Sequence, residues 1–118
     1  MANPTIQLYI SKKNFDAQKA ERFFKERRVQ VQVMDLKKHR LGDREILLFA
    51  RAAGGIMNLI DREDKKVKEH PACYQDREEL LLEAIREDPF LLRSPIVRCG
   101  QKAAVGLCPE EWEKWLRG

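Results

Sequence analysis

The chain has 118 residues, a mass of 13.9 kDa and a formal net charge of +4, from 23 Lys and Arg against 19 Asp and Glu. This length predicts one domain over residues 1–118, and 43% hydrophobic residues suffice for a core without disulfide or metal staples. The sequence has neither a run long enough to span a membrane nor a signal-peptide pattern, so we expect a cytoplasmic protein with reduced cysteines. The mild charge favours a solvated surface over direct nucleic-acid binding.

The first third of the chain predicts a strand, a helix and a second strand. Apolar residues alternate over 5–10, which is the period of a half-buried strand. Asn14 is a good helix cap, and apolar residues recur after it at helical spacing as far as residue 28. Alternation over 29–33 predicts the second strand. This order calls for a parallel pair joined by a right-handed crossover.

The middle of the chain, about residues 37–88, predicts helices and no strand. Asp43 is expected to cap a helix that Gly54-Gly55 ends, and Asp76 to cap a second helix that stops before Pro89. The residues expected to face inward are Ile46, Leu47, Phe49, Ala50 and Ala53 in the first helix, and Leu80, Leu81, Ala84 and Ile85 in the second.

The last third predicts a hairpin followed by a helix. Pro95 opens a short apolar run, Gly100-Gln101 turns it back, and Pro109 suits a first helical position before the core anchors Trp112 and Trp115. A proline at the mouth of such a hairpin is half of a thioredoxin-type fold, where the Ser94–Pro95 bond is expected to be cis. We therefore predict the α/β class: a thioredoxin-like mixed four-stranded sheet (βαβ … ββα) with an inserted helical subdomain. The strand at 96–98 should run antiparallel to the first.

Three segments, in this order and spacing, resemble the ArsC/Spx family of glutaredoxin-coupled arsenate reductases and their relatives, which include the transcriptional regulator Spx. They are Tyr9-Ile10-Ser11-Lys12 with Lys19-Ala20 near the start, Gly54-Gly55 with Leu59-Ile60 in the middle, and residues 91–97, 105–106 and 110–112 at the end. The last segment is the most specific, since family members read similarly through the proline, hairpin and terminal helix. The resemblance covers nearly the whole chain.

The resemblance implies a cysteine at the start of the first helix, where the helix dipole lowers the thiol pKa. That position is Asn14 here, and a slip of one residue would give Phe15. The second cysteine of a CxxC pair would be Ala17. The resemblance therefore implies that the family's redox nucleophile is missing.

The family's oxyanion-binding arginines are also displaced. The position just before the proline, where the family has an arginine, is Ser94 here, and Arg93 lies one residue earlier. The position of the family's middle arginine aligns with Glu63, next to Arg62. The residues of the expected vestigial pocket are Lys12, Lys13, Asn14, Arg93, Ser94, Pro95 and Arg98. Asn14 is favoured as a helix cap over a ligand-pocket residue. For the lysines and arginines of this set, together with Lys19 and Arg22, a solvated surface is the favoured interpretation, and an anion-attracting surface is the alternative.

Cys99 and Cys108 are the candidates for a displaced redox cysteine, although small, partly buried thiols are the favoured interpretation. His70 and Cys73 have a spacing that zinc could use, but there is no second pair. We therefore expect neither a metal nor a cofactor.

Gly54 and Gly55 have a possible role in partner binding, because in Spx a glycine at the place of Gly55 lies on the surface that docks the RNA polymerase α subunit. A helix stop is the favoured alternative. The expected function is non-catalytic: a family member that binds the α subunit or another protein, in transcriptional regulation, without membrane binding. The alternatives are an arsenate reductase or glutaredoxin-coupled thiol oxidoreductase that uses a displaced cysteine, and a small-anion binding protein.

Overall fold

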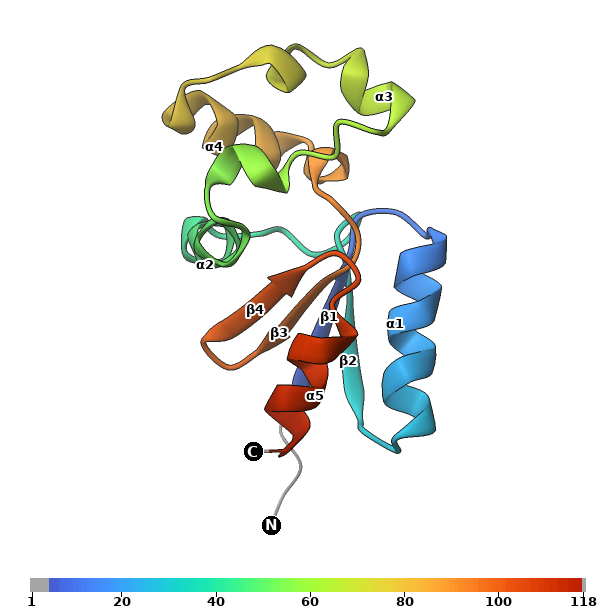
Figure 1. Cartoon of the computed structure of the whole chain (residues 1–118). Helices are drawn as coiled ribbons and strands as arrows, with labels where there is room; N and C mark the ends of the chain where they lie inside the picture. Colours follow the sequence, from blue (N-terminus) through green and yellow to red (C-terminus); the bar gives the residue numbers. More distant parts are fainter. Residues whose placement is uncertain (1–4, 118) are drawn as a thin grey trace.

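A mixed sheet with helices on both faces forms the centre of the computed structural model, which describes residues 5–117 (Figure 1). Its strands and helices are β1 (Ile6–Ile10), α1 (Phe15–Glu26), β2 (Val31–Asp35), α2 (Asp43–Ala53), α3 (Lys65–Lys68), α4 (Glu78–Glu87), β3 (Ile96–Cys99), β4 (Lys102–Val105) and α5 (Pro109–Arg117). Three short 3-10 helices are η1 (Ile56–Leu59), η2 (Pro71–Tyr74) and η3 (Pro89–Leu91).

The topology of the sheet confirms the predicted fold. Its four strands have the order β2-β1-β3-β4. β1 runs parallel to β2, with Ile6 opposite Val31, and antiparallel to β3, with Leu8 opposite Val97. The Ser94–Pro95 peptide bond is cis, as expected.

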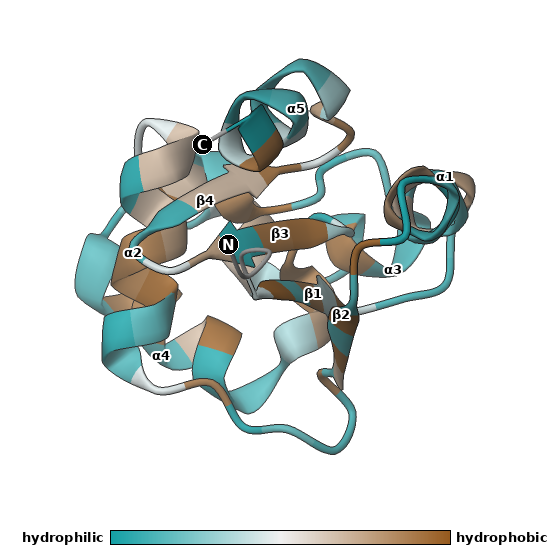
Figure 2. Ribbon diagram, turned by 90° about the horizontal axis from the view of Figure 1, so that it is seen from below, coloured by the Kyte–Doolittle hydropathy of each residue, from teal (hydrophilic) through white to brown (hydrophobic). Residues whose placement is uncertain are grey.

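The sheet separates two hydrophobic cores (Figure 2). On one face, Ile6, Leu8 and Ile10 pack with residues of α1 and α5, where Trp112 is fully buried against Phe24. On the other face, Tyr9 packs against α2 and the rest of the helical segment between β2 and β3. Because β1 and β3 are central strands, both of their faces are buried, which explains their nearly continuous apolar sequences.

The helical block from Asp43 to Glu87 lies at one end of the sheet, but two of its predicted caps are wrong. Asp43 is the first residue inside α2; the cap is Gly42, whose backbone N–H donates to the Glu45 carboxylate (3.1 Å). Asp76 also lies outside the cap of α4, which is Arg77; before the helix, the side chain of Gln75 accepts from the N–H groups of Asp76 (3.2 Å) and Arg77 (3.1 Å). Each helix therefore starts one residue away from the position that its aspartate predicted, and neither cap residue bonds the first-turn N–H groups through a side chain.

Two residues predicted to face inward in these helices do not. Leu47 is 52% exposed and Leu80 is 37% exposed, whereas Ile46, Phe49, Leu81 and Ile85 are fully buried. In each helix the predicted buried face included one residue too many, because adjacent apolar residues give the same sequence signal whichever of them faces the core.

The second strand begins two residues later than its alternation predicts. Val29 precedes β2, and Val33 is 52% exposed on this edge strand. An edge strand has one neighbour in the sheet and less cover from helices, so its valine alternation does not report a buried face.

No helix in the described part of the chain is long and apolar enough to cross a membrane.

Candidate functional site

The loop between β1 and α1 is bonded to the segment that precedes β3, and these contacts form what we call the closed corner: Ser11, Asn14, Ser94 and the backbone they bind. The Asn14 amide donates to the Ser94 carbonyl (2.9 Å), and the Ser94 hydroxyl donates to the Lys12 carbonyl (2.8 Å). The Ser11 hydroxyl donates to the Leu92 carbonyl (2.9 Å). Ser11 and Ser94 are each 5% exposed; the Ser11 bond is buried, and the other two bonds are partly buried.

Asn14 is fixed at both ends of its side chain. Its Oδ1 accepts from the Ala17 N–H (2.8 Å), which confirms the predicted helix cap, while its Nδ2 binds the Ser94 carbonyl. The side chain therefore joins the start of α1 to the cis-proline segment. A carboxamide held in this way is a structural group without nucleophilic character.

Lys12 lies at the border of the closed corner and forms two ion pairs. Its Nζ lies 2.9 Å from Asp61 Oδ2 and 2.8 Å from Asp64 Oδ2. Partial burial lowers the pKa of Lys12, but the bonds to the two carboxylates outweigh this effect and raise the pKa above its usual value. The bond to Lys12 in turn lowers the pKa of Asp64, whose other oxygen caps α3.

The structure gathers part of the predicted vestigial pocket. Lys12, Asn14, Ser94 and the cis Pro95 meet at the closed corner, and Lys13 lies beside it in the same loop. The exposed Arg93 turns toward Gly106, where an added Cβ would lie 3.1 Å from its Nη2.

Arg98 does not join this group, which corrects the sequence-based expectation. It lies opposite Gln7, several residues before the carboxyl end of β1, and its Nε donates to the Gly100 carbonyl (2.7 Å). Its position three residues after Pro95 places the Arg98 side chain along the strand, away from the strand's mouth.

None of the three cysteines belongs to the closed corner. Burial raises the pKa of the Cys108 thiol, the nearby Arg93 lowers it less, and its Sγ donates to the Val105 carbonyl (3.4 Å). Cys73 is 8% exposed in the core of the helical block, and the half-buried Cys99 packs against the α1 and α5 core. His70 does not pair with Cys73; its two ring nitrogens contact the Ala72 N–H (3.0 Å) and the Asp88 carboxylate (2.9 Å).

A cleft of about 720 Å³ opens beside the closed corner, at the carboxyl ends of β1 and β2. We call it the lysine cleft. Its lining residues are Ser11, Lys12, Lys13, Lys37, Asp64, Lys65, Lys66 and Phe90. Lys12 and Lys13 were expected from the sequence, but Lys37, Asp64, Lys65, Lys66 and Phe90 were not. They come from the β2–α2 connection, the start of α3 and η3, whose approach depends on the fold. The charged run at 61–69 was the available signal.

A partly buried polar cluster, on the face of β1 that packs against α2, was also missed. The Tyr9 hydroxyl donates to Glu45 Oε2 (2.9 Å), and His39 Nε2 lies 3.4 Å from the same oxygen. Burial raises the pKa of Tyr9, and the bond to Glu45 raises it further. Burial acts to raise the pKa of Glu45, but the Gly42, Tyr9 and His39 bonds together lower it. The cluster ties α2 to the sheet.

Gly54 and Gly55 end α2, as the helix-stop alternative states. Both have positive φ (83° and 144°), and the Gly55 N–H donates to the Ala50 carbonyl (2.8 Å). Gly55 also lines a groove of about 400 Å³ between α2, η1 and α4. The other lining residues are Leu47, Ala50, Arg51, Ile56, Glu78, Glu79 and Leu82.

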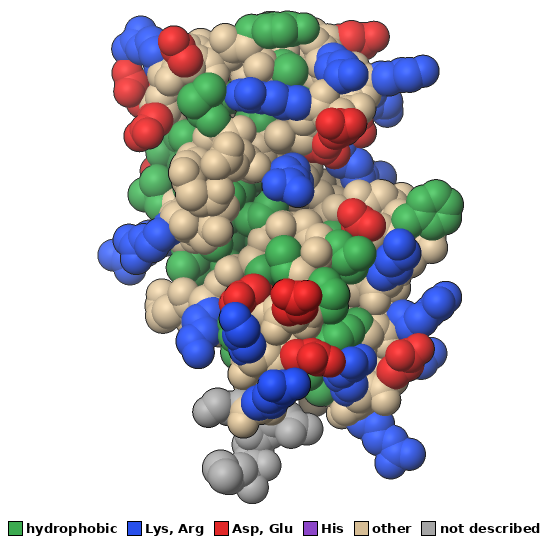
Figure 3. All heavy atoms as spheres, in the orientation of Figure 1, with side chains coloured by type: hydrophobic (Ala, Val, Ile, Leu, Met, Phe, Trp, Pro, Cys, Tyr) green, Lys and Arg blue, Asp and Glu red, His purple; other side chains and the backbone are tan. Residues whose placement is uncertain are grey.

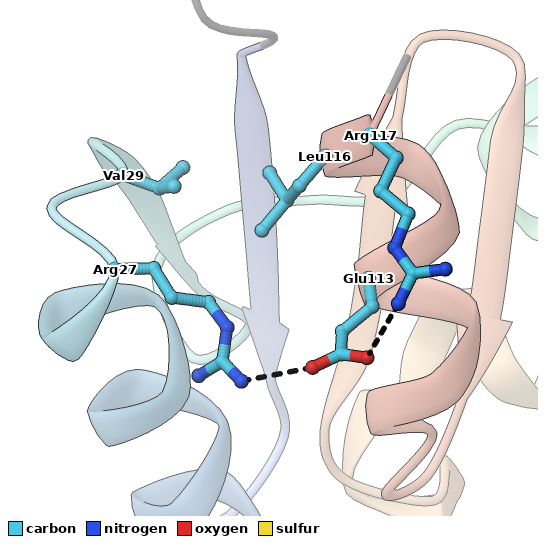
Figure 4. Close-up of a pocket in the computed structure, with 5 residues that line it drawn as sticks. All are labelled: Arg27, Val29, Glu113, Leu116 and Arg117. Carbon is cyan, nitrogen blue, oxygen red and sulfur yellow. Dashed lines mark hydrogen bonds and ion pairs between the residues drawn. The ribbon is translucent and has the colours of Figure 1, made fainter.

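A further pocket, of about 310 Å³, lies between the ends of α1 and α5 (Figure 4). There Arg27 and Arg117 both bind Glu113, at 3.0 and 3.7 Å. The carboxylate stands between the two guanidinium groups and occupies the place that an external anion would take. This pocket therefore offers little attraction to an anionic ligand.

The comparisons with known proteins agree with the fold. The ArsC family model matches residues 9–115. An arsenate reductase from Vibrio cholerae is similar in structure, with a TM-score of 0.80 at 19% identity over 98% of this chain and 100% of that one. An arsenate reductase related protein from Brucella melitensis gives a TM-score of 0.68 at 17% identity over 97% and 96%. No match is found among curated protein sequences. Since the family match spans nearly the whole chain, the protein belongs to the ArsC family.

Proposed function

We propose that this protein is a non-catalytic member of the ArsC family that acts by binding another protein. The observation that carries this proposal is Asn14: it occupies the start of α1, and both ends of its side chain are bonded within the closed corner. In the family resemblance this is the place of the reacting thiolate. A carboxamide cannot form a thiolate, so the reaction would lack its nucleophile.

The rival function is thiol oxidoreduction by a displaced cysteine, and the geometry gives it little support. Cys108 comes closest, at the start of α5, but burial raises the pKa of its thiol, so the thiolate is disfavoured. Cys73 is buried in the other core. A reactive cysteine is normally accessible and has a lowered pKa, and Cys108 lacks the second property.

The binding surface that we propose is the groove around Gly55. Leu47 stands beside it with 52% of its surface exposed, on a helix that is otherwise amphipathic. Arg51, Glu78 and Glu79 give the groove a charged border around an apolar centre, as in many protein interfaces. By the resemblance to Spx, the first candidate partner is the C-terminal domain of the RNA polymerase α subunit, with transcriptional regulation as the setting.

The catalytic half of the proposal is tested by assaying arsenate reduction with glutathione and glutaredoxin. We expect no turnover by the unaltered protein. Turnover that is lost in one of Cys73→Ser, Cys99→Ser or Cys108→Ser would establish the displaced-cysteine rival. As a positive test of the corner, Asn14→Cys should carry a thiol that alkylates faster at neutral pH than Cys108, because it would lie at the N-terminus of α1.

The binding half is tested by titrating the α-subunit domain against three variants. Gly55→Arg and Leu47→Arg should each weaken binding at least about tenfold, and Leu107→Arg, at an exposed leucine outside the groove, should not. Leu47→Arg is needed because a side chain at Gly55 is strained by its positive φ, which alone costs about 1 kcal/mol. Absence of binding at tens of micromolar, or equal binding by all three variants, would reject this partner and groove.

A further inference from the structure

The lysine cleft has more positive charge than its own acidic residues neutralise. Five lysines and one aspartate line it. Lys12 is occupied by Asp61 and Asp64, but within residues 5–117 no ion pair involves Lys13, Lys37, Lys65 or Lys66. Like charges that converge on one concavity repel one another and attract a multivalent anion.

The position of the cleft in the fold also suits a ligand. It lies beyond the carboxyl ends of the parallel strands β1 and β2, with Ser11 directly after β1 and Lys37 shortly after β2. In open α/β sheets this is the edge where small ligands bind. A volume of about 720 Å³ falls within the range of small-molecule sites, which is about 300–1,000 Å³.

One wall of the cleft is aromatic. Phe90, in η3, is 37% exposed, although a phenyl ring of this size is normally buried. The ring of His70 packs against it in a T-shaped arrangement at 5.8 Å between centroids, which holds its orientation. An exposed ring that is held in place beside several ammonium groups provides a stacking surface for a planar group carried by the anion.

From these three observations we propose that the lysine cleft binds a nucleoside polyphosphate, with the phosphates on Lys13, Lys37, Lys65 and Lys66 and the base against Phe90. Asn14 and Ser94 of the closed corner take no part, because their side chains are bonded internally. On the face shown in Figure 3, Lys and Arg side chains are interspersed with Asp and Glu side chains. This distribution favours a small ligand over a nucleic-acid strand.

The test is calorimetric titration of the full chain with ATP, AMP, tripolyphosphate and a single-stranded oligonucleotide. ATP should bind with at least about tenfold higher affinity than AMP, because more phosphate charge reaches the lysines, and more tightly than tripolyphosphate, which has no base. The double variant Lys37→Gln/Lys65→Gln should lose about tenfold or more in ATP affinity. The matched control, Lys25→Gln/Lys102→Gln, removes the same charge from exposed lysines outside the cleft and should bind ATP as the unaltered protein does.

The role of the aromatic wall needs its own variant. Phe90→Ala should weaken ATP about fivefold or more and leave tripolyphosphate unchanged. Phe90→Leu keeps apolar packing against His70, so it should fold normally and still lose base stacking. No heat with millimolar ATP, equal losses in the cleft and control double variants, or equal affinity for ATP and tripolyphosphate would each overturn the proposal. An oligonucleotide that binds more tightly than ATP would overturn it in favour of a nucleic-acid strand.

Discussion

The closed corner and the lysine cleft share Ser11 and Lys12 but use their polar side chains in opposite ways. In the corner, Asn14 and Ser94 are bonded to the protein's own backbone, and Ser94 is 5% exposed. In the cleft, Lys37, Lys65 and Lys66 are exposed, and they make no ion pair within the described residues. Two neighbouring sites that share the β1–α1 loop thus differ in whether their polar side chains have partners within the protein.

Because of this difference, we expect the corner to contribute to folding stability and the cleft to contribute to ligand binding. A buried bond that loses one partner leaves the other unsatisfied, at a cost of about 1–3 kcal/mol. An exposed charge without a partner contributes little to folding and remains available to a ligand. Variants of the corner should therefore change the free energy of unfolding, and variants of the cleft should change binding.

The largest effect is expected for Asn14→Ala, which removes two interactions at once. Loss of the helix cap costs about 1 kcal/mol, and loss of the bond to the Ser94 carbonyl about another 1 kcal/mol. Urea unfolding should show a total loss of about 2 kcal/mol. Asn14→Asp keeps the capping oxygen and should lose less than Asn14→Ala. A change below about 0.5 kcal/mol for Asn14→Ala would mean that the corner contributes no more than a surface loop.

Ser94→Ala should have the next largest effect, a loss of about 1 kcal/mol, because the Lys12 carbonyl would lose its buried donor. Its effect should not be additive with that of Asn14→Ala, since both side chains join the same two segments. A double-mutant cycle measured by urea unfolding gives the coupling. Strict additivity would show that the two bonds act independently and that the corner is not a single unit.

Much of the fold could be predicted because its local signals agree with its tertiary structure. The cap at Asn14, the hairpin after Pro95 and the helix stop at Gly54 are each set by one or two residues with strong backbone preferences. The caps predicted at Asp43 and Asp76 were wrong because each helix starts one residue away from the expected cap, after Gly42 and after Arg77. A candidate cap residue in the sequence fixes a helix start only to within a residue or two.

The candidate sites were predicted less completely, for a physical reason. Asn14 and Ser94 could be assigned to one pocket in advance because the family resemblance places the start of the first helix near the proline. The lysine cleft could not, since Lys37, Lys65 and Phe90 come together through the packing of three separate segments. Arg98 shows the converse: it is close in sequence to Pro95, yet the strand carries its side chain away from the corner.

Asp64→Asn should have a smaller effect than the corner variants, below about 1 kcal/mol at neutral pH, since the ion pair with Lys12 is partly exposed. The pKa of Asp64 is lowered from 3.8, so its contribution is present above about pH 4 and is lost as the pH falls through the folded pKa. The pKa of Lys12 is raised from 10.5, so the same pair persists below that pH and is lost as the pH rises through the folded value.

The difference in unfolding free energy between the unaltered protein and Asp64→Asn should therefore shrink at both pH extremes. Urea titrations between pH 3 and pH 7 test the acid side. Glu63→Gln is the control, because Glu63 is an exposed neighbour with no ion pair among residues 5–117, and it should show no such trend. A difference that stays constant below pH 4 would exclude the ion pair as its source.

The smallest effect is expected in the cleft itself. Lys37→Gln/Lys65→Gln should change the free energy of unfolding by less than about 0.5 kcal/mol, and any change should be stabilising, because the variant relieves repulsion among like charges. Raising the salt from about 0.01 M to 0.3 M shortens the screening length from about 30 Å to well below 10 Å, so it should abolish that gain. A loss above about 1 kcal/mol would show that these lysines have structural partners after all. The lysines would then be bonded within the protein, as the polar groups of the closed corner are, and the positive charge of the cleft would no longer indicate a binding site.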